Sequence, residues 1–238
     1  SAGMYQILQR ISTIINYDIL SSGKKLIIWH PGSNYRNSST YYNNHPLRDK
    51  IYKHLYAIDL YRLSPKNNND IPIMPYHYID FDINKYIDIF KKKLQIYPRT
   101  ILHIPSKTTT KGTTSINATI QKLQLPHHEL NYKMLTGIPY MDVIVEKEKS
   151  LFYIDQFAPE LTGGIGIAAF EGIIHSNLVF CSTNFVNDAL SIITKQHMLP
   201  VIDMGTTVSS MERVLEHHIQ LSDQELIDLA IEKGKWME

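Results

Sequence analysis

The second half of the chain constrains the fold most, because short apolar segments and longer amphipathic segments alternate there at regular spacing. The apolar segments predict strands over residues 100–104, 129–135, 151–155, 178–182 and 199–203. Helical spacing of apolar residues predicts helices over residues 113–124, 139–149, 165–175, 208–217 and 222–235. Strands that alternate with helices in this way predict an α/β fold, in which helices cover both faces of a parallel sheet.

The first half is less regular. Its patterns predict helices over residues 4–18, 46–56 and 83–93, strands over 26–29 and 57–63, and an extended connector over 71–80. Two prolines in this connector argue against a central strand. Pro98 ends the last helix, and we place a domain boundary there. We therefore expect a shortened Rossmann-like domain over residues 1–98 and a Rossmann-type nucleotide-binding domain over residues 99–238.

Composition excludes several classes of protein. The chain of 238 residues has 24 Lys and Arg against 23 Asp and Glu, which argues against a broad basic face for nucleic acid. Its single cysteine, Cys181, excludes an internal disulfide and a Cys-based zinc finger, and its place on an apolar strand predicts burial. No apolar run approaches the ~20 residues of a membrane span. Without a secretory signal, we expect a cytoplasmic enzyme.

A loop rich in hydroxyl and ammonium groups follows the first strand of the second half. It contains Ser106, Lys107, Lys111 and Gly112 and leads directly into a helix at Thr113. Free N–H groups at a helix start, together with a mobile lysine, suit a phosphate group. The spacing is not that of a Walker A loop. The alternative is an ordinary polar surface loop with a threonine cap.

A glycine-rich turn leads from the third of these strands into the next helix. Gly163, Gly164, Ile165 and Gly166 form this turn, which allows a ligand to approach the backbone closely. Glu171 follows on the helix within an apolar run, where a buried carboxylate needs a partner and a ribose diol is a suitable donor. The alternative is a glutamate at the exposed edge of the helix.

These elements together resemble the nucleotide-binding domain of GT-B glycosyltransferases, most closely retaining family 4, also called glycosyltransferase group 1. The resemblance covers about residues 99–205. It depends on His103-Ile104-Pro105-Ser106, Lys111-Gly112-Thr113, Asp155-Gln156 and the run from Gly163 to Gly172.

The resemblance implies a role for each matched position. Lys111 would contact the diphosphate of a UDP- or GDP-sugar, the amides of Gly163, Gly164 and Ile165 would lie near the phosphate or sugar, and Glu171 would bind the ribose hydroxyls. It further implies a GT-B-like fold, hexosyl transfer with retention, and no metal or cofactor beyond the donor.

The first half resembles the family's acceptor domain more weakly. His30 lies in the segment Trp29-His30-Pro31-Gly32-Ser33, which looks like the loop that ends a central strand of that domain. Imidazole titrates near neutral pH, so His30 joins Lys111 as a candidate catalytic residue, for acceptor contact or proton transfer. The alternative is a histidine that only bonds to its own loop. We expect either a naturally short acceptor domain or a shortened piece of a longer one.

Two departures from the family keep a second function open. Thr108 stands where the family has a phosphate-binding arginine, and Gly163 stands where it has the first acid of Glu-x7-Glu. The alternative to an enzyme is therefore a degenerate nucleotide- or sugar-binding protein, or a partner subunit. A nucleotide-sugar 2-epimerase is a third option. Asp80-Phe81-Asp82 matches a metal-binding Asp-x-Asp motif, but it follows the connector and we expect no metal there.

Overall fold

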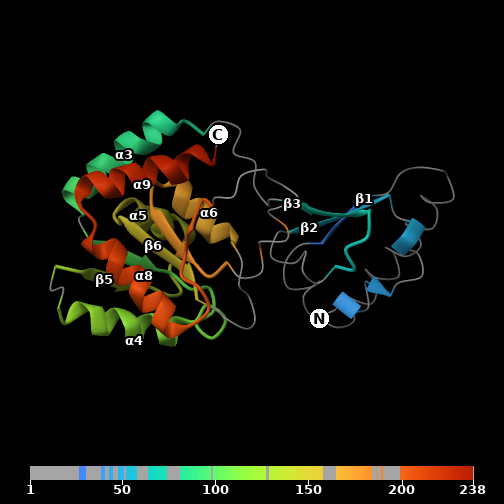
Figure 1. Cartoon of the computed structure of the whole chain (residues 1–238), viewed down its shortest axis with the longest axis horizontal. Helices are drawn as coiled ribbons and strands as arrows, with labels where there is room; N and C mark the ends of the chain where they lie inside the picture. Colours follow the sequence, from blue (N-terminus) through green and yellow to red (C-terminus); the bar gives the residue numbers. More distant parts are fainter. Residues whose placement is uncertain are drawn as a thin grey trace. The chain divides into compact units, whose positions relative to one another are not determined.

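The structure of this chain is a computed structural model, and it describes most of the second half and parts of the first. The described residues are 27–30, 39–40, 43–44, 48–50, 52–57, 64–73, 81–97, 99–126, 129–157, 165–183, 186, 189 and 199–237. The chain divides into two compact units, Ser1–Met74 and Pro75–Glu238 (Figure 1). The predicted helix over residues 4–18 lies outside the described residues.

The first unit contains a small parallel sheet. Its strands β1 (Ile27–His30), β2 (Lys53–Ala57) and β3 (Asp70–Ile73) lie in the order β1-β2-β3. Pro72 on β3 pairs with Tyr56 on β2, and β3 lies at one end of the strand order. A proline lacks the N–H that a second neighbour would need, so an edge position suits it. The extended connector predicted over residues 71–80 is wrong at its start, which belongs to this strand, and residues 74–80 lie outside the described residues.

The helix predicted over residues 46–56 is wrong. Among the described residues of this segment, Arg48–Lys50 form a short 3-10 turn, η1, and residues 53–57 form β2, which pairs with a strand on each side. The buried side chain of Arg48 forms an ion pair with Asp70 at the start of β3, and His54 Nε2 lies 3.1 Å from the carbonyl oxygen of Arg48. Pairing with distant strands thus overrides the local helical pattern. The strand predicted over 57–63 falls outside the described residues after Ala57.

The second unit contains a sheet of five parallel strands, as predicted. These are β4 (Thr100–His103), β5 (Asn131–Met134), β6 (Phe152–Gln156), β7 (Leu178–Cys181) and β8 (Ile202–Asp203). Their order is β5-β4-β6-β7-β8, and every neighbouring pair is parallel. The central strands β4, β6 and β7 are buried along their whole length, as expected for a sheet covered on both faces.

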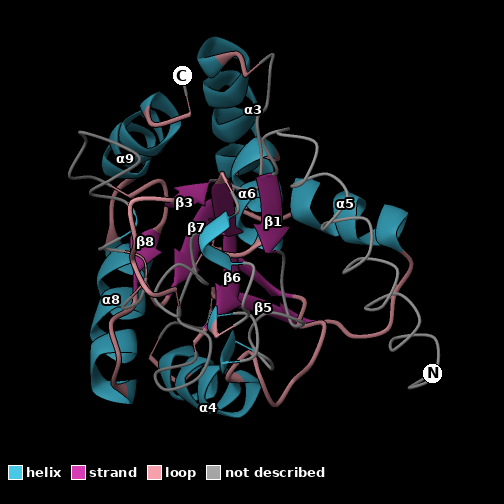
Figure 2. Ribbon diagram, turned by 90° about the vertical axis from the view of Figure 1, so that its right-hand side faces the viewer, coloured by secondary structure: helices cyan, strands magenta, loops and turns pink. Residues whose placement is uncertain are grey.

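Helices cover this sheet on both faces (Figure 1). They are α3 (Ile83–Ile96), α4 (Thr113–Gln124), α5 (Tyr140–Glu148), α6 (Ile167–Ile174), α8 (Val208–Gln220) and α9 (Asp223–Lys235). Figures 1 and 2 place α3 and α9 on one side of the strands and α4 on the other, and α8 packs against α4. The predicted α/β class with a parallel, Rossmann-like sheet is therefore confirmed. Within the described residues, no helix has both the length and the apolar character needed to cross a membrane.

Helix α3 belongs to the second unit, although it precedes Pro98, where we expected the boundary. Asp82 caps its start by accepting hydrogen bonds from the N–H groups of Asn84 and Lys85. Its apolar face packs along α9, where the Cβ of a residue larger than Gly234 would lie 3.1 Å from the ring of Tyr86. The boundary between the compact units consequently lies ahead of this helix, after Met74.

A buried lysine, Lys93, joins α3 to the ends of α5 and α6. Lys93 is only 3 % exposed, and its ammonium donates to the carbonyl oxygens of Lys147, at 2.7 Å, and of His175. These carbonyls lie at the C-terminal ends of α5 and α6, where helix carbonyls lack partners within the helix and attract positive charge. Burial lowers the pKa of Lys93 to about 7, although nearby Glu148 favours the charged form.

Replacing Lys93 with methionine should remove a pH-dependent part of the stability. Lysine in an unfolded chain has a pKa of about 10.4, so unfolding between about pH 7 and pH 10 takes up a proton. The free energy of unfolding of the unmodified protein therefore rises with pH in this window, by at most about 1.4 kcal/mol per pH unit, and Lys93→Met lacks this contribution. Urea denaturation at several pH values measures the difference.

Lys92→Met is the matched control, because Lys92 is exposed on the same helix. Its stability should follow that of the unmodified protein at every pH. A constant difference between Lys93→Met and the unmodified protein across the window would contradict the assignment.

Candidate functional site

The candidate site lies where the strand order of the second unit reverses. From β4 the chain passes through α4 to β5 on one side, and through α5 it returns to β6 on the other side of β4. The loops that follow β4 and β6 therefore diverge, and a crevice at the carboxyl ends of two such strands is the usual ligand site of an open parallel sheet. Lys111 belongs to the first of these loops and Asp155 to the end of β6.

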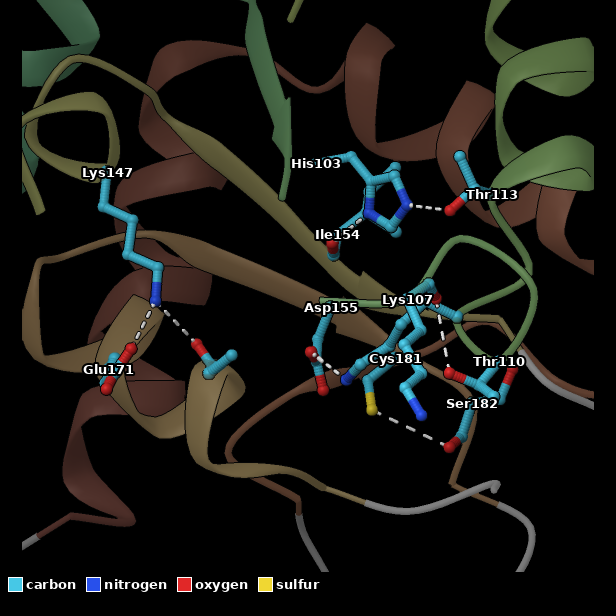
Figure 3. A network of polar contacts seen from close by, with 12 residues as sticks. His103, Lys107, Thr110, Thr113, Lys147, Ile154, Asp155, Glu171, Cys181 and Ser182 are labelled. Carbon is cyan, nitrogen blue, oxygen red and sulfur yellow. Dashed lines mark hydrogen bonds and ion pairs between the residues drawn. The ribbon is translucent and has the colours of Figure 1, made fainter. Parts of the chain in front are cut away.

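An ion pair joins the loop after β4 to the end of β6. The ammonium of Lys111 lies 2.6 Å from Asp155 Oδ1, with side-chain exposures of 17 % for the lysine and 1 % for the aspartate. A carboxylate this deeply buried needs a counter-charge, and Lys111 supplies it. Figure 3 shows Asp155 with the dashed line to this ammonium. Asp155 was recognised only as part of the Asp-Gln motif, and its pairing with Lys111 was not predicted.

Asp155 lies at an irregularity in its strand. The pairing of β6 with β7 shifts register between Ile154 and Gln156, so that Asp155 is an extra residue in the ladder. Such bulges re-aim a side chain and are common beside functional sites. The Oδ2 atom of Asp155 is buried, and no group among the described residues forms a hydrogen bond with it. One carboxylate oxygen thus holds Lys111, and the other has no hydrogen-bond partner within the described part of the chain.

Gly166 lies directly against this pair. A Cβ at this position would lie 3.1 Å from Asp155 Oδ2 and 3.7 Å from the ammonium of Lys111. Gly166 is also the N-cap residue of α6, and it provides no side chain to cap the first turn. The N-terminus of α6, with its free N–H groups and partial positive charge, therefore lies beside the Lys111 ammonium.

His103 connects the sheet to the helix start that follows the Lys111 loop. Its ring is fully buried, with Nδ1 2.8 Å from the carbonyl oxygen of Ile154 and Nε2 2.9 Å from Thr113 Oγ1 (Figure 3). A carbonyl only accepts, so Nδ1 carries the proton and the hydroxyl of Thr113 donates to Nε2. Burial lowers the pKa of His103 and keeps the ring neutral. The histidine thereby connects β4, β6 and the start of α4.

Gly112 makes the same connection possible from the backbone. Its φ of 68° lies in the left-handed region, and a Cβ there would lie 1.6 Å from the carbonyl oxygen of Phe157. The N–H of Phe157 in turn donates to the carbonyl of Lys111 at 3.0 Å. Only glycine combines this conformation with such close contact to the end of β6. The position of Lys111 therefore depends on Gly112.

Glu171 is held by a second buried lysine. Lys147 on α5 has a side chain that is 0 % exposed, and its ammonium lies 2.9 Å from Glu171 Oε2, with the glutamate side chain 18 % exposed (Figure 3). The hydroxyl of Tyr140 donates to Glu171 Oε1 at 3.3 Å. The carboxylate of Glu171 raises the pKa of Tyr140, and burial lowers the pKa of Lys147, although Glu171 favours its charged form. Both partners of Glu171 were missed in the sequence.

The two ion pairs belong to one electrostatic environment. Asp155 favours the charged form of Lys147, whereas Lys111 opposes it, so these charges act on one another across the end of the sheet. The candidate site thus brings together a lysine beside a helix N-terminus and a partly exposed carboxylate on the same helix. Such a combination suits a ligand with an anionic end and a hydroxyl-bearing end.

The remaining predicted residues lie as follows. Ser106 and Lys107 are exposed, and the carbonyl of Lys107 accepts from the N–H groups of Thr110 and Lys111. The hydroxyl of Thr113 is committed to His103, and its N–H donates to Thr108. Ile165 is buried, so that only its backbone is left for a ligand.

Four residues singled out in the sequence are not placed in full. Gly163 and Gly164 lie outside the described residues, and so does Asp80 of the Asp-x-Asp motif. His30 ends β1, where parallel strands present their carboxyl ends, but its side chain lies outside the described part of the chain. Cys181 is fully buried at the end of β7, as predicted.

Comparison with known proteins gives no family for this chain. No protein-family model matches the sequence, and no curated protein matches it.

Replacing Gly112 with alanine should destabilise the second unit strongly. The left-handed conformation alone costs a residue with a Cβ about 1–2 kcal/mol, and the contact with Phe157 adds to it, so we expect a loss of more than about 2 kcal/mol. Gly137→Ala is the matched control, because Gly137 has a φ of 67° but nothing within 4 Å of its Cβ position. We expect a loss of about 1 kcal/mol there. Equal losses in chemical denaturation would show that the contact with Phe157 does not matter.

Breaking the Lys111–Asp155 pair from the lysine side should also destabilise the protein. Lys111→Met leaves Asp155 buried without a counter-charge, and the expected cost is on the order of 3 kcal/mol. Adding Asp155→Asn should recover much of this loss in a double-mutant cycle measured by urea denaturation. Lys122→Met removes the exposed pair of Lys122 with Glu212, and it should change stability by no more than about 0.5 kcal/mol. Additive effects of the Lys111 and Asp155 substitutions would contradict the coupling.

Proposed function

We propose that this chain binds a nucleotide-sugar and transfers its hexosyl group to an acceptor, as a glycosyltransferase. The supporting observation is that one helix, α6, has an ammonium beside its start and a carboxylate further along it. Lys111 lies beside the N-terminus of α6 at Gly166, and Glu171 follows on the same helix with one oxygen that an exposed tyrosine contacts. The first feature suits a diphosphate and the second suits a ribose diol.

The proposed chemistry requires little from the protein beyond this arrangement. When the bond between sugar and diphosphate breaks, negative charge develops on the leaving diphosphate. A fixed ammonium at Lys111 and the N–H groups that begin α6 stabilise that charge, and their preorganisation lowers the barrier. Asp155 keeps the ammonium of Lys111 in position before the donor arrives. The resemblance to retaining family 4 suggests retention of configuration and a UDP- or GDP-sugar donor, and it assigns acceptor contact to His30.

One observation favours a second candidate, a nucleotide- or sugar-binding protein without transfer activity. Asp155 already neutralises Lys111, and Thr108, where the resembling family has an arginine, is exposed and adds no charge. The net charge available to a leaving diphosphate is then smaller than a lysine and an arginine together would provide. Binding of a diphosphate through the helix N-terminus remains compatible with this arrangement.

Direct binding and turnover measurements separate these functions. Calorimetric titration with UDP and GDP, and detection of released diphosphate from UDP-glucose, UDP-N-acetylglucosamine and GDP-mannose, are the two readouts. We expect one diphosphate to bind, Lys111→Ala to weaken it about tenfold or more, and slow release of diphosphate from the matching sugar donor. Lys122→Ala, at the other end of α4, is the control and should bind normally.

Binding without release from any donor, with and without added acceptor sugars, would favour the non-enzymatic candidate. Absence of binding to both diphosphates would exclude the proposed transferase with a UDP- or GDP-sugar donor, and a protein that binds either of these nucleotides. Because Lys111→Ala exposes the Asp155 charge, its folding is checked by circular dichroism before the titrations.

A further inference from the structure

Lys147 is a fully buried charge of the second unit that the proposed chemistry does not use. Its side chain is 0 % exposed, although it lies on α5, a helix with several exposed apolar residues. Burying an ammonium is costly unless the surrounding groups compensate for the lost water. Methionine fills a similar volume without that cost, so the charge itself calls for an explanation.

The surroundings hold Lys147 at both ends. Its backbone carbonyl accepts from the ammonium of Lys93 at 2.7 Å and from the side-chain amide of Asn177 at 3.0 Å. Its own ammonium donates to the carbonyl of Ala168 at 3.1 Å and lies 4.7 Å from the ring centroid of Tyr153. With both ends fixed, the ammonium has one defined position, directed at Glu171 (Figure 3).

The two oxygens of Glu171 consequently have different environments. Oε2 is fixed by the buried ammonium of Lys147 at 2.9 Å. Among the described residues, Oε1 receives a hydrogen bond only from the hydroxyl of Tyr140, at the longer distance of 3.3 Å, and Tyr140 is 60 % exposed. An exposed side chain with one long hydrogen bond is displaced easily, because water replaces the bond that it loses. Glu171 thus presents one immobile oxygen and one oxygen under a removable hydroxyl.

We infer that Lys147 is a positioning residue that orients Glu171 to accept a vicinal ribose diol, and that the Tyr140 hydroxyl occupies the place of a ligand hydroxyl until the ligand arrives. This inference rests on the proposed function, since it concerns the ribose end of the same nucleotide. It adds a specificity: the site selects ribonucleotides over 2′-deoxyribonucleotides.

The selectivity follows from the number of hydrogen bonds that each sugar donates to Glu171. A diol donates two hydrogen bonds to a carboxylate that is ionised and held in place, whereas a deoxyribose donates one fewer and leaves a charged acceptor unsatisfied. A freely rotating carboxylate would turn to other partners, so the missing hydroxyl would cost it less binding free energy. The degree of discrimination therefore reports on how firmly Glu171 is held. Tyr140 affects a different quantity, because its hydroxyl competes equally with any ligand.

The test compares ribose and deoxyribose ligands across four variants. Calorimetric titration is performed with UDP and GDP and with their 2′-deoxy forms, on the unmodified protein and on Lys147→Met, Glu171→Gln, Tyr140→Phe and Lys133→Met. Lys133 is a matched control, because it forms a lysine–glutamate pair of 3.0 Å with Glu146 on the same helix α5, away from Glu171. Circular dichroism establishes that each variant is folded.

We expect the unmodified protein and Lys133→Met to prefer the ribonucleotide about tenfold. Lys147→Met and Glu171→Gln should lose most of this preference, and Tyr140→Phe should keep it while binding the ribonucleotide about threefold more tightly. A loss of preference in Glu171→Gln but not in Lys147→Met would overturn the positioning role. If Lys147→Met does not fold, Tyr140→Phe decides, and unchanged affinity there overturns the inference. Failure of the unmodified protein to bind either diphosphate would instead refute the proposed function.

Discussion

The ion pair between Lys111 and Asp155 determines the arrangement of the candidate site. Asp155 is 1 % exposed at a bulge in β6, where a carboxylate without a counter-charge would be costly to bury. Lys111 reaches it only because the loop after β4 turns sharply at Gly112 and bonds to Phe157. The pair therefore fixes the loop, the start of α4 and the end of β6 relative to one another. Any ligand at the switch point meets this preorganised set of charges.

Lysines with little exposure have a general role in the second unit. Lys93, Lys111 and Lys147 each place an ammonium against carbonyl or carboxylate oxygens near the ends of helices or of β6. Lys93 satisfies the carbonyls that end α5 and α6, and Lys147 reaches the backbone of α6 and Glu171. Apolar residues would pack there at lower cost, but they would leave carbonyls and carboxylates unsatisfied. The polar ends of the elements are thus held by charge, and the middle of the sheet is held by apolar packing.

Much of the second unit was predictable, because local patterns and tertiary packing agree there. The helices over 113–124 and 222–235 follow directly from the residues, and the structure has both, the second from Asp223. The first unit was harder. The helix expected over 46–56 gave way to β2, since its partners are strands distant in the chain and no local pattern records them. The roles of the site residues came from their chemistry and from the resemblance, and they stay predictions.

The alternation of strands and helices, the loop that carries Lys111 and the helix that carries Glu171 all follow from the amino-acid sequence, because periodicity and glycine positions are local properties of the chain. The charge partners, in contrast, are visible only in the folded chain. Lys147 stands in a run of alternating charges that is typical of an exposed helix face, and yet it is fully buried. Asp155 meets Lys111 across 44 residues. Such pairs depend on strand order and on a bulge in the ladder, and these form only when distant segments pack together.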